Sequence, residues 1–266
     1  MKWSCAPLSS VVSAENMNQS FWQPAPEDLR LHPFQCHVWM HRWDRDTTPD
    51  AACLALLDES SRSRANRFRR PEDRRRFLST HATLRVLLSR YLGFSPAQIQ
   101  IGTAKGGKPR LELNSAKASS DVRFNLSHSG GLSLMSFALG AEVGVDVEQV
   151  QHRTQVRELV ERWFSPREQT GLLRLPESDL RPAFFRTWAC KEAYLKGLGE
   201  GLLRGLGTFS VETNPVKPAA LIEDPELPES PARWRIQDIP VDEGYVAAIS
   251  TPHPHASGIR GFLTPG

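Results

Sequence analysis

A five-residue segment that alternates apolar and acidic side chains constrains the fold of this chain more than any other feature. The segment runs from Gly144 to Glu148 and reads G-V-D-V-E. A period of two predicts a β-strand with one buried face, because successive side chains point to opposite sides of a sheet. Asp146 and Glu148 therefore share one face, and the two valines turn into a core.

A second segment, some forty residues further along, has the period of a helix. It runs from Trp188 to Lys196 and reads W-A-C-K-E-A-Y-L-K. Its large apolar residues form one stripe, whereas Glu192 and Lys196 lie one turn apart on a neighbouring face. If this helix packs against the acidic strand, three carboxylates and one ammonium group converge on one pocket.

Three carboxylates beside an ammonium group suit a hard divalent cation and a phosphate. Mg²⁺ prefers oxygen ligands and is commonly held by one or two carboxylates with substrate phosphates and water. A nearby lysine offers a charge for a phosphate oxygen or for charge that develops on a leaving group. Each motif alone has an ordinary alternative, a half-exposed strand or a surface Glu–Lys pair worth about 0.2–0.5 kcal/mol. Only their joint occurrence favours a site.

Together with three upstream elements, the two motifs resemble the 4′-phosphopantetheinyl transferases of the longer, surfactin-synthetase-activating (Sfp) type. That family carries G-[IV]-D-[IV]-E on a strand and W-x-x-K-E-[AS]-x-x-K on a helix. The upstream elements are a basic segment with Arg67-Phe68 and Glu72-Asp73, a turn at Gly107-Lys108-Pro109, and F-N-L-S-H-S from Phe124 to Ser129. All five stand in the family's order between about residues 58 and 210.

The resemblance implies an α+β fold of two similar lobes, a pseudo-dimer in which each lobe has a small antiparallel sheet packed against helices. The cofactor would lie in the cleft between the lobes. We expect a loose N-terminal extension over residues 1–30, an N-terminal lobe over 31–141, a C-terminal lobe over 142–251 and a C-terminal tail over 252–266. The long helices are expected over about 74–92 and 180–197.

The implied activity is that of a holo-[acyl-carrier-protein] synthase. The enzyme would move the 4′-phosphopantetheine arm of coenzyme A to a serine of an apo acyl or peptidyl carrier protein and release 3′,5′-ADP. The nucleophile would come from the partner, which fits a chain without a convincing catalytic Ser, Cys or Thr of its own. A catalytically inactive carrier-binding relative is the alternative, but the acidic residues and Lys196 are intact.

The resemblance also assigns roles to individual residues. The ligands of Mg²⁺, or of Mn²⁺, would be Asp146, Glu148 and Glu192. Glu192 would serve as base, ligand or both, and Lys196 would steady the phosphate under attack. The residues expected to bind coenzyme A are Arg64, Arg67, Lys108, Ser127, His128 and Lys196. On the residues alone, the Lys108 segment also reads as a simple turn, because the G-x-x-x-x-G-K-[ST] frame of a P-loop is absent.

Eight arginines between residues 62 and 76 allow three interpretations. A solvated helix face is the ordinary one. A nucleic-acid interface is the second, because arginines neutralise phosphates, but few aromatic residues are interleaved and no nucleic-acid-binding signature is present. The third follows from the resemblance: Arg64 and Arg67 would receive the 3′-phosphate of coenzyme A.

The composition fits a cytoplasmic enzyme. The chain has 266 residues and a formal net charge of +3, so global charge indicates no polyanionic partner. Its four cysteines show no C-x-x-C spacing and are expected to be reduced, with Cys190 buried rather than nucleophilic. No apolar run reaches the roughly 18 residues of a membrane span, and the N-terminus does not read as a signal peptide. We therefore expect a monomer that binds neither membrane nor nucleic acid.

Overall fold

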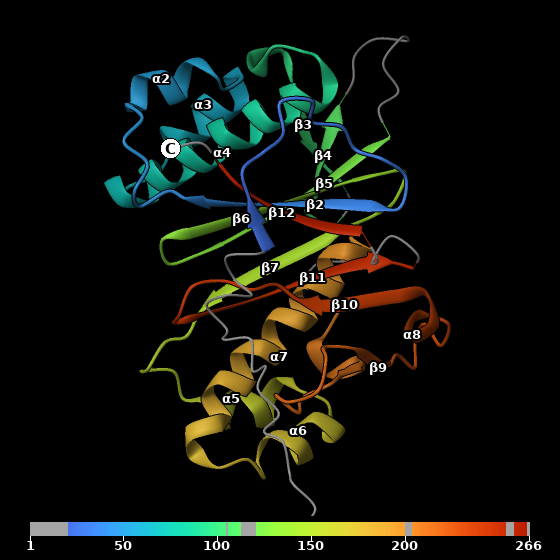
Figure 1. Cartoon of the computed structure of the whole chain (residues 1–266). Helices are drawn as coiled ribbons and strands as arrows, with labels where there is room; N and C mark the ends of the chain where they lie inside the picture. The colour runs from blue at the N-terminus through green and yellow to red at the C-terminus, as the bar shows by residue number, and fades with distance from the viewer. Residues whose placement is uncertain (1–20, 105, 113–120, 200–203, 254–257, 265–266) are drawn as a thin grey trace, which may run out of the picture.

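Four layers stack on one another in the computed structural model, which describes residues 21–104, 106–112, 121–199, 204–253 and 258–264. Helices of the N-terminal lobe cover a five-stranded sheet, a three-stranded sheet lies beneath it, and the helices of the C-terminal lobe cover the far face of that second sheet (Figure 1). The predicted α+β class is confirmed. No helix in the described ranges is long and apolar enough to cross a membrane.

The N-terminal lobe is built on a sheet with strand order β1-β12-β2-β6-β5. Its strands are β1 (Trp22–Gln23), β2 (Gln35–Arg42), β5 (Val122–Ser129), β6 (Leu132–Leu139) and β12 (Gly258–Leu263). Its helices are α2 (Asp50–Ala55), α3 (Glu59–Ala65), α4 (Pro71–Leu92) and η1 (Pro96–Gln98), and a hairpin of β3 (Gln100–Thr103) and β4 (Pro109–Glu112) completes it. The long helix ends at Gly93, which takes the left-handed conformation that glycine tolerates.

The C-terminal lobe is built on the antiparallel sheet β10-β11-β7, formed by β7 (Gly144–Gln149), β10 (Trp234–Asp238) and β11 (Tyr245–Pro252). Its helices are α5 (Val156–Trp163), α6 (Pro166–Leu172), α7 (Glu177–Leu198), η3 (Leu206–Thr208) and α8 (Ser230–Arg233). A short hairpin joins β8 (Ser210–Val211) to β9 (Leu221–Glu223). The predicted acidic strand and lysine-bearing helix are β7 and α7.

Alternation along the strands separates three large apolar cores. One face of β7 places Val145 and Val147 in the core between the two sheets, where they meet Val38 and Met40 of β2. The opposite face of the five-stranded sheet packs against α4, and the opposite face of the three-stranded sheet packs against α7. Val147, which lies between the two acidic residues, is therefore a core residue whose side chain points away from the acidic face.

Two predictions about the chain ends were wrong within the described residues. Residues 258–263 were expected to belong to a tail, but they form β12, which lies between β1 and β2 and runs parallel to both. Residues 22–23 were expected to belong to a loose extension, but they form β1. The N-terminal sheet is therefore mixed rather than antiparallel, and both ends of the described chain belong to it. The rest of the predicted extension, residues 1–20, lies outside the described residues.

Helix α7 lies directly on β7 because Gly144 has no side chain there. A Cβ atom at this position would stand 2.0 Å from the carbonyl oxygen of Ala193 and 2.3 Å from the amide nitrogen of Gly197. The glycine of the G-V-D-V-E motif thus permits a backbone-to-backbone approach. That approach brings the acidic face of β7 against the helix that carries Glu192 and Lys196.

The buried strand β12 yields a prediction about stability. Phe262 is fully buried against His37 and Trp39, whereas its neighbour Leu263 is 43% exposed. Phe262→Ala should lower the free energy of unfolding by about 3–5 kcal/mol through the cavity it leaves. Leu263→Ala is the matched control and should change it by no more than about 0.5 kcal/mol. Urea denaturation measures both; equal effects would show that β12 does not contribute its core face to the sheet.

The close approach at Gly144 yields a second prediction. Gly144→Ala should destabilise the protein by about 1–3 kcal/mol or more, because backbone atoms rather than a flexible side chain occupy the space. Gly205→Ala is the control, since the nearest atom to its added Cβ would be 3.8 Å away. Thermal unfolding of the two variants compares them. If the Gly144→Ala protein were as stable as the Gly205→Ala protein, the close backbone approach of α7 to β7 would be contradicted.

Candidate active site

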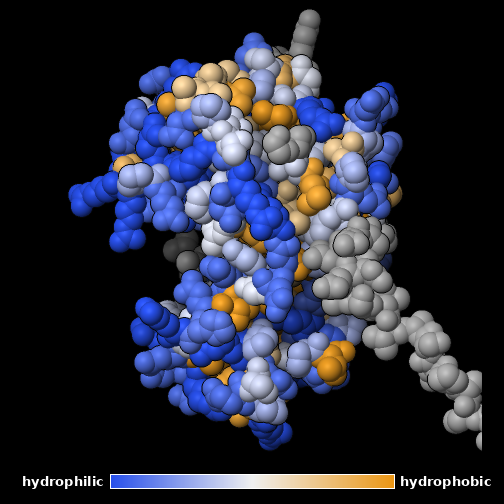
Figure 2. All heavy atoms as spheres, turned by 60° about the vertical axis from the view of Figure 1, so that its left-hand side comes forward, coloured by the Kyte–Doolittle hydropathy of each residue, from blue (hydrophilic) through white to orange (hydrophobic). Residues whose placement is uncertain are grey.

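One face of α7 lines a cavity between the lobes. Trp188, Glu192 and Lys196 follow one another at intervals of four residues, so they lie on a single face of the helix. The cavity has a volume of about 350 Å³, and β5 and β7 supply the rest of its lining: Leu126, Ser127, His128, Asp146 and Glu148. The structure therefore brings together the three predicted carboxylates, Lys196, Ser127 and His128. In the space-filling view the outline narrows between the upper and lower parts of the molecule, and mainly hydrophilic residues flank the indentation (Figure 2).

Asp146 lies at the centre of the polar contacts in the cavity. Its Oδ1 atom accepts a hydrogen bond from Ser127 Oγ at 2.8 Å and is 2.5 Å from the ammonium of Lys196, which also donates to Ser127 Oγ at 3.0 Å. Its Oδ2 atom is buried without a hydrogen-bond partner among the residues that the structure describes. One half of this carboxylate is thus satisfied and the other half is free to accept a ligand.

The other two carboxylates are less well neutralised. Glu148 accepts one hydrogen bond, from Ser129 Oγ at 2.9 Å, and Glu192 Oε1 is buried without a partner in the described part of the chain. Burial, reinforced by the negative charge of Asp146, raises the pKa of Glu148 to about 7. Burial also raises the pKa of Glu192, against the opposing effect of Lys196. Both groups would be stabilised in the ionised form by an additional positive charge.

This donor set fits a hard divalent cation. All the candidate donors are carboxylate oxygens, which Mg²⁺ prefers, and two of them have no other partner. As they stand, no three acidic, His or Cys side chains in the described ranges are close enough together to enclose an ion, and the ammonium of Lys196 pairs with Asp146. Lys196 therefore competes with a cation for Asp146, and the carboxylates must draw together around an ion for all three to bind it.

A ladder of polar side chains on β5 holds the acidic strand in place. Asn125 Oδ1 accepts from the amide of Val145 at 3.0 Å, and Ser129 Oγ accepts from the amide of Gln149 at 3.0 Å while it donates to Glu148. These residues alternate along β5 with Ser127 between them, so all three face β7. The F-N-L-S-H-S motif therefore joins the two lobes as well as supplying the cavity. The period-two spacing of its polar residues was the signal by which Asn125 and Ser129 could have been found.

The two arginines predicted to bind a phosphate have different surroundings. The guanidinium of Arg64 lies over the ring of Phe77, 5.2 Å from its centroid. The pKa of His81 is lowered to about 3, mainly by burial and next by the charge of Arg64. His128, at the cavity, also contributes to this lowering. Both arginines are exposed, and Nε of Arg67 donates to the carbonyl of Ser63 at 3.4 Å. Neither arginine lines the cavity, and the electrostatic effect on His81 is the observation that favours Arg64.

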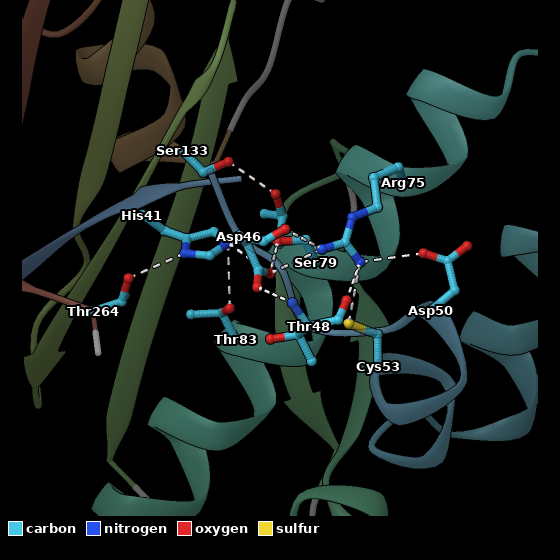
Figure 3. A network of polar contacts seen from close by, with 11 residues as sticks. His41, Asp46, Thr48, Asp50, Cys53, Arg75, Ser79, Thr83, Ser133 and Thr264 are labelled. Atoms are coloured by element: carbon cyan, nitrogen blue, oxygen red, sulfur yellow. Dashed lines mark hydrogen bonds and ion pairs between the residues drawn. The ribbon is translucent and has the colours of Figure 1, made fainter. Parts of the chain in front are cut away.

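Other arginines of the run have structural partners. Arg75 donates to the carbonyl oxygens of Asp46 and Thr48, in a network that also joins Ser79 to His41 and Asp46 (Figure 3). Arg74 pairs with Asp50, so both arginines fasten α4 to the segment that follows β2. Arg75 is thus directed into a polar network and is not part of a solvated face (Figure 3). Burial lowers the pKa of His128, and the second cause of the lowering is the charge of Arg76, which the sequence did not single out.

Lys108 lies away from the other predicted residues. Its ammonium donates to Glu142 at 2.5 Å and to the carbonyl oxygens of Val143 and Gly197 at 3.0 and 3.2 Å. It is not among the residues that line the cavity. In this structure Lys108 binds the C-terminal turn of α7, where the last carbonyl groups of a helix carry partial negative charge.

Cys190, which was expected to be buried rather than nucleophilic, is a core residue. It is fully buried, and burial raises the pKa of its thiol to about 12. The thiolate that nucleophilic chemistry requires is therefore not formed near neutral pH. Cys36, Cys53 and Cys190 are all free and buried, as expected for reduced thiols.

The raised pKa of Glu148 predicts a pH-dependent stability. Between the ordinary value of 4.5 and about 7, the folded protein holds a proton that the unfolded chain has released. The contribution of this group to stability is therefore complete below pH 4.5 and is lost as the pH rises through about 7. With chelator present, Glu148→Gln should be more stable than the wild type by about 1–3 kcal/mol at about pH 8. This gain in stability should vanish near pH 4.5. Urea denaturation measures the free energy of unfolding at both pH values, and equal gains at the two would contradict the prediction.

Comparison with known proteins places both lobes in one family. Residues 142–250 match the model of the 4′-phosphopantetheinyl transferase superfamily, and residues 41–138 match that of the 4′-phosphopantetheinyl transferase N-terminal domain. The chain is 35% identical over 234 residues to the 4′-phosphopantetheinyl transferase HetI of Nostoc sp., covering 88% of this chain and 94% of the relative. It is 29% identical over 202 residues to the 4′-phosphopantetheinyl transferase Sfp of Bacillus subtilis, covering 76% and 84%.

A more distant match is the L-aminoadipate-semialdehyde dehydrogenase-phosphopantetheinyl transferase of Mus musculus, which is 22% identical over 252 residues, or 88% of this chain and 78% of the relative. The two family models follow one another along the chain and together account for both sides of the cavity. This chain therefore belongs to the 4′-phosphopantetheinyl transferase superfamily, in the branch that joins an N-terminal transferase domain to a second domain carrying the acidic strand.

Proposed function

We propose that this transferase moves the 4′-phosphopantetheine arm of coenzyme A onto a serine hydroxyl of an apo acyl or peptidyl carrier protein. The single observation that carries the proposal is the cavity lined by the buried Asp146, the half-buried Glu148 and Glu192, Ser127 and the ammonium of Lys196. The serine oxygen would bond to the phosphorus that bears the pantetheine arm. The bond from that phosphorus to 3′,5′-ADP would break, and the serine proton would pass to a base.

Three carboxylates are the proposed ligands of Mg²⁺: Asp146, Glu148 and Glu192. Bound there, the ion would neutralise the pyrophosphate as charge develops on 3′,5′-ADP. The free Oδ2 of Asp146 and Oε1 of Glu192 support this assignment, because both oxygens are buried and neither has a hydrogen-bond partner among the described residues.

The proton of the incoming serine is assigned to Glu192, directly or through water. Its side chain lines the cavity on α7, and burial raises its pKa, which makes its carboxylate a stronger base than an exposed glutamate. A carboxylate that binds a metal is a weaker base, so the two roles of Glu192 oppose each other. A water molecule activated beside Glu192 would reconcile them.

Lys196 is the proposed contact to the phosphate under attack. Its ammonium now pairs with Asp146, and its side chain is 26% exposed at the cavity, so it can exchange one anion for another without entering a new environment. An ammonium placed where charge builds up stabilises the transition state more than the ground state. His128, whose pKa burial and Arg76 lower, would be neutral and would donate one N–H to a phosphate oxygen.

The remaining contacts to coenzyme A are proposed for the N-terminal lobe. Arg64 would bind the 3′-phosphate; in support, its charge acts on His81, whose pKa also responds to His128 at the cavity. Arg67 and Lys108 are weaker candidates: the first donates to the carbonyl of Ser63, and the second would have to leave Glu142. One chain supplies both sides of the cavity, so we propose that the enzyme acts as a monomer.

A transfer assay tests the function and the metal ligands together. Incubation with coenzyme A, Mg²⁺ and an apo carrier protein should add the mass of the phosphopantetheine arm to the carrier. Asp146→Asn should lower turnover about 100-fold or more, because even the loss of a residue that only supports a metal ligand costs about 10–100-fold, while the exposed Asp28→Asn leaves it unchanged. Mass spectrometry reads the product. Near wild-type turnover of Asp146→Asn at saturating Mg²⁺ would refute the metal assignment.

A comparison of two cofactors tests the 3′-phosphate site. Arg64→Ala should weaken binding of coenzyme A by about 1.5–3 kcal/mol, as expected for a lost hydrogen bond between charged groups. It should leave binding of 3′-dephospho-coenzyme A nearly unchanged. Arg69→Ala, at a neighbouring exposed arginine outside the proposed set, is the matched control, and isothermal titration calorimetry measures all four affinities. Equal weakening of both cofactors by Arg64→Ala would return this residue to the solvated surface.

A further inference from the structure

The lysine that precedes Glu192 lies on the core face of α7, away from the cavity. Lys191 is fully buried, as is Glu168 of α6, and its ammonium is 2.6 and 2.7 Å from the two carboxylate oxygens of Glu168. Residues on this side of a helix are ordinarily apolar, since burying a charge is costly unless it is paired and hydrogen-bonded. The position of Lys191 therefore requires an explanation that the cavity does not supply.

Both members of this pair have a full set of partners. Besides Glu168, the ammonium of Lys191 donates to the carbonyl oxygen of Phe209 at 2.6 Å and lies 4.1 Å from the centroid of the Phe209 ring. The carboxylate of Glu168 also accepts from the amides of Ser165 at 3.0 Å and Val211 at 2.8 Å. A buried charge pair satisfied in this way has one well-defined geometry.

The partners belong to three separate elements. Glu168 is the third residue of α6 and closes a capping box with Ser165 at the start of that helix. Phe209 directly precedes β8, Val211 is the last residue of β8, and Lys191 belongs to α7. The pair therefore fixes the orientation of α7 about its own axis relative to the start of α6 and to β8. Rotating α7 about this axis would break all of these contacts together.

The rotation of α7 decides what enters the cavity. Successive residues of a helix are about 100° apart, so with Lys191 directed toward α6, Glu192 is directed to the neighbouring face. That face also carries Trp188 and Lys196 and lines the cavity. The two halves of the K-E dipeptide thus have opposite environments: a satisfied core charge and an unsatisfied cavity charge.

We propose that Lys191 and Glu168 are positioning residues, which fix the rotation of α7 so that Glu192 and Lys196 are presented to the reacting groups. This rests on the proposed function of the cavity. Neither residue touches substrate or metal, and each acts only through the helix. Their loss should therefore lower the turnover of the folded enzyme and change the Michaelis constant for coenzyme A little.

The experiment compares variants that break the pair from either side. Lys191→Met removes the ammonium and keeps an unbranched side chain of similar length. Glu168→Asp keeps the charge but withdraws the carboxylate by one methylene, which makes it a milder change than Glu168→Gln. Lys217→Met is the control, because Lys217 forms an exposed pair with Glu212 at 3.6 Å. Turnover, the Michaelis constant for coenzyme A, and amide hydrogen exchange over residues 188–196 are measured at a temperature where circular dichroism shows each variant to be folded.

Lys191→Met and Glu168→Asp should each lower turnover by about 10–100-fold, as a displacement of catalytic groups by about 1 Å can. Both should speed amide exchange over residues 188–196, and Lys217→Met should do neither. The double variant Lys191→Met/Glu168→Gln should be no slower than the worse of its single variants, because all three lose the same constraint. It also removes both charges, so it remains informative if a single variant does not fold.

Two results would overturn the proposal. If the Glu168 variants keep full turnover while Lys191→Met loses it, the charge of Lys191 acts on the substrate itself. If every variant keeps turnover and normal exchange once folded, the pair contributes to stability alone. Amide exchange separates this inference from the proposed function: a wild type without transfer activity refutes that function, and the pair is then judged by whether exchange over residues 188–196 responds to its loss.

Discussion

The close packing of α7 against β7 at Gly144 is the physical constraint on which the rest of the structure depends. Without a side chain at this position, backbone atoms of the strand and of the helix approach one another directly. Gly197, the penultimate residue of the helix, continues the contact against the ring of Trp234. A helix held this close places its polar face beside the acidic face of the strand, so the cavity follows from packing before any electrostatic term is considered.

Electrostatics then distinguishes two kinds of buried charge on the same helix. Lys191 and Glu168 satisfy one another and three backbone groups, which makes the pair inert toward ligands. Glu192 and Asp146 each keep a buried oxygen that no described residue contacts. A buried polar atom without a partner is costly, and for these carboxylate oxygens the cost is offset when a cation binds. The unsatisfied charges mark the candidate active site, and the satisfied pair is its proposed support.

The local motifs predicted most of the active site. Strand and helix periods were sufficient to place Asp146, Glu148, Glu192 and Lys196 together, because each motif carries its own spacing and the contact between the two elements was the only tertiary assumption. The same reasoning overlooked Asn125 and Ser129, whose alternation on β5 was visible but whose partners were not.

Features that depend on distant pairing could not be predicted in this way. The strand β12 is short and its parallel partners, β1 and β2, lie at the other end of the chain, so nothing in its own six residues distinguishes it from a tail. The arginine run shows the same limit. Arg75 binds backbone carbonyls whereas Arg64 lies exposed over the ring of Phe77, and only the folded arrangement of α2, α3 and α4 separates the two.

The crystal structure of the protein with coenzyme A and Mg²⁺ is the most direct test of the central claim, that α7 and β7 together form a metal-dependent phosphate site. The account predicts carboxylate oxygens of Asp146, Glu148 and Glu192 at about 2.1 Å from the ion. It also predicts that the ammonium of Lys196 has moved from Asp146 to the pyrophosphate. An ion held only by phosphates and water, with Lys196 still paired to Asp146, would contradict it.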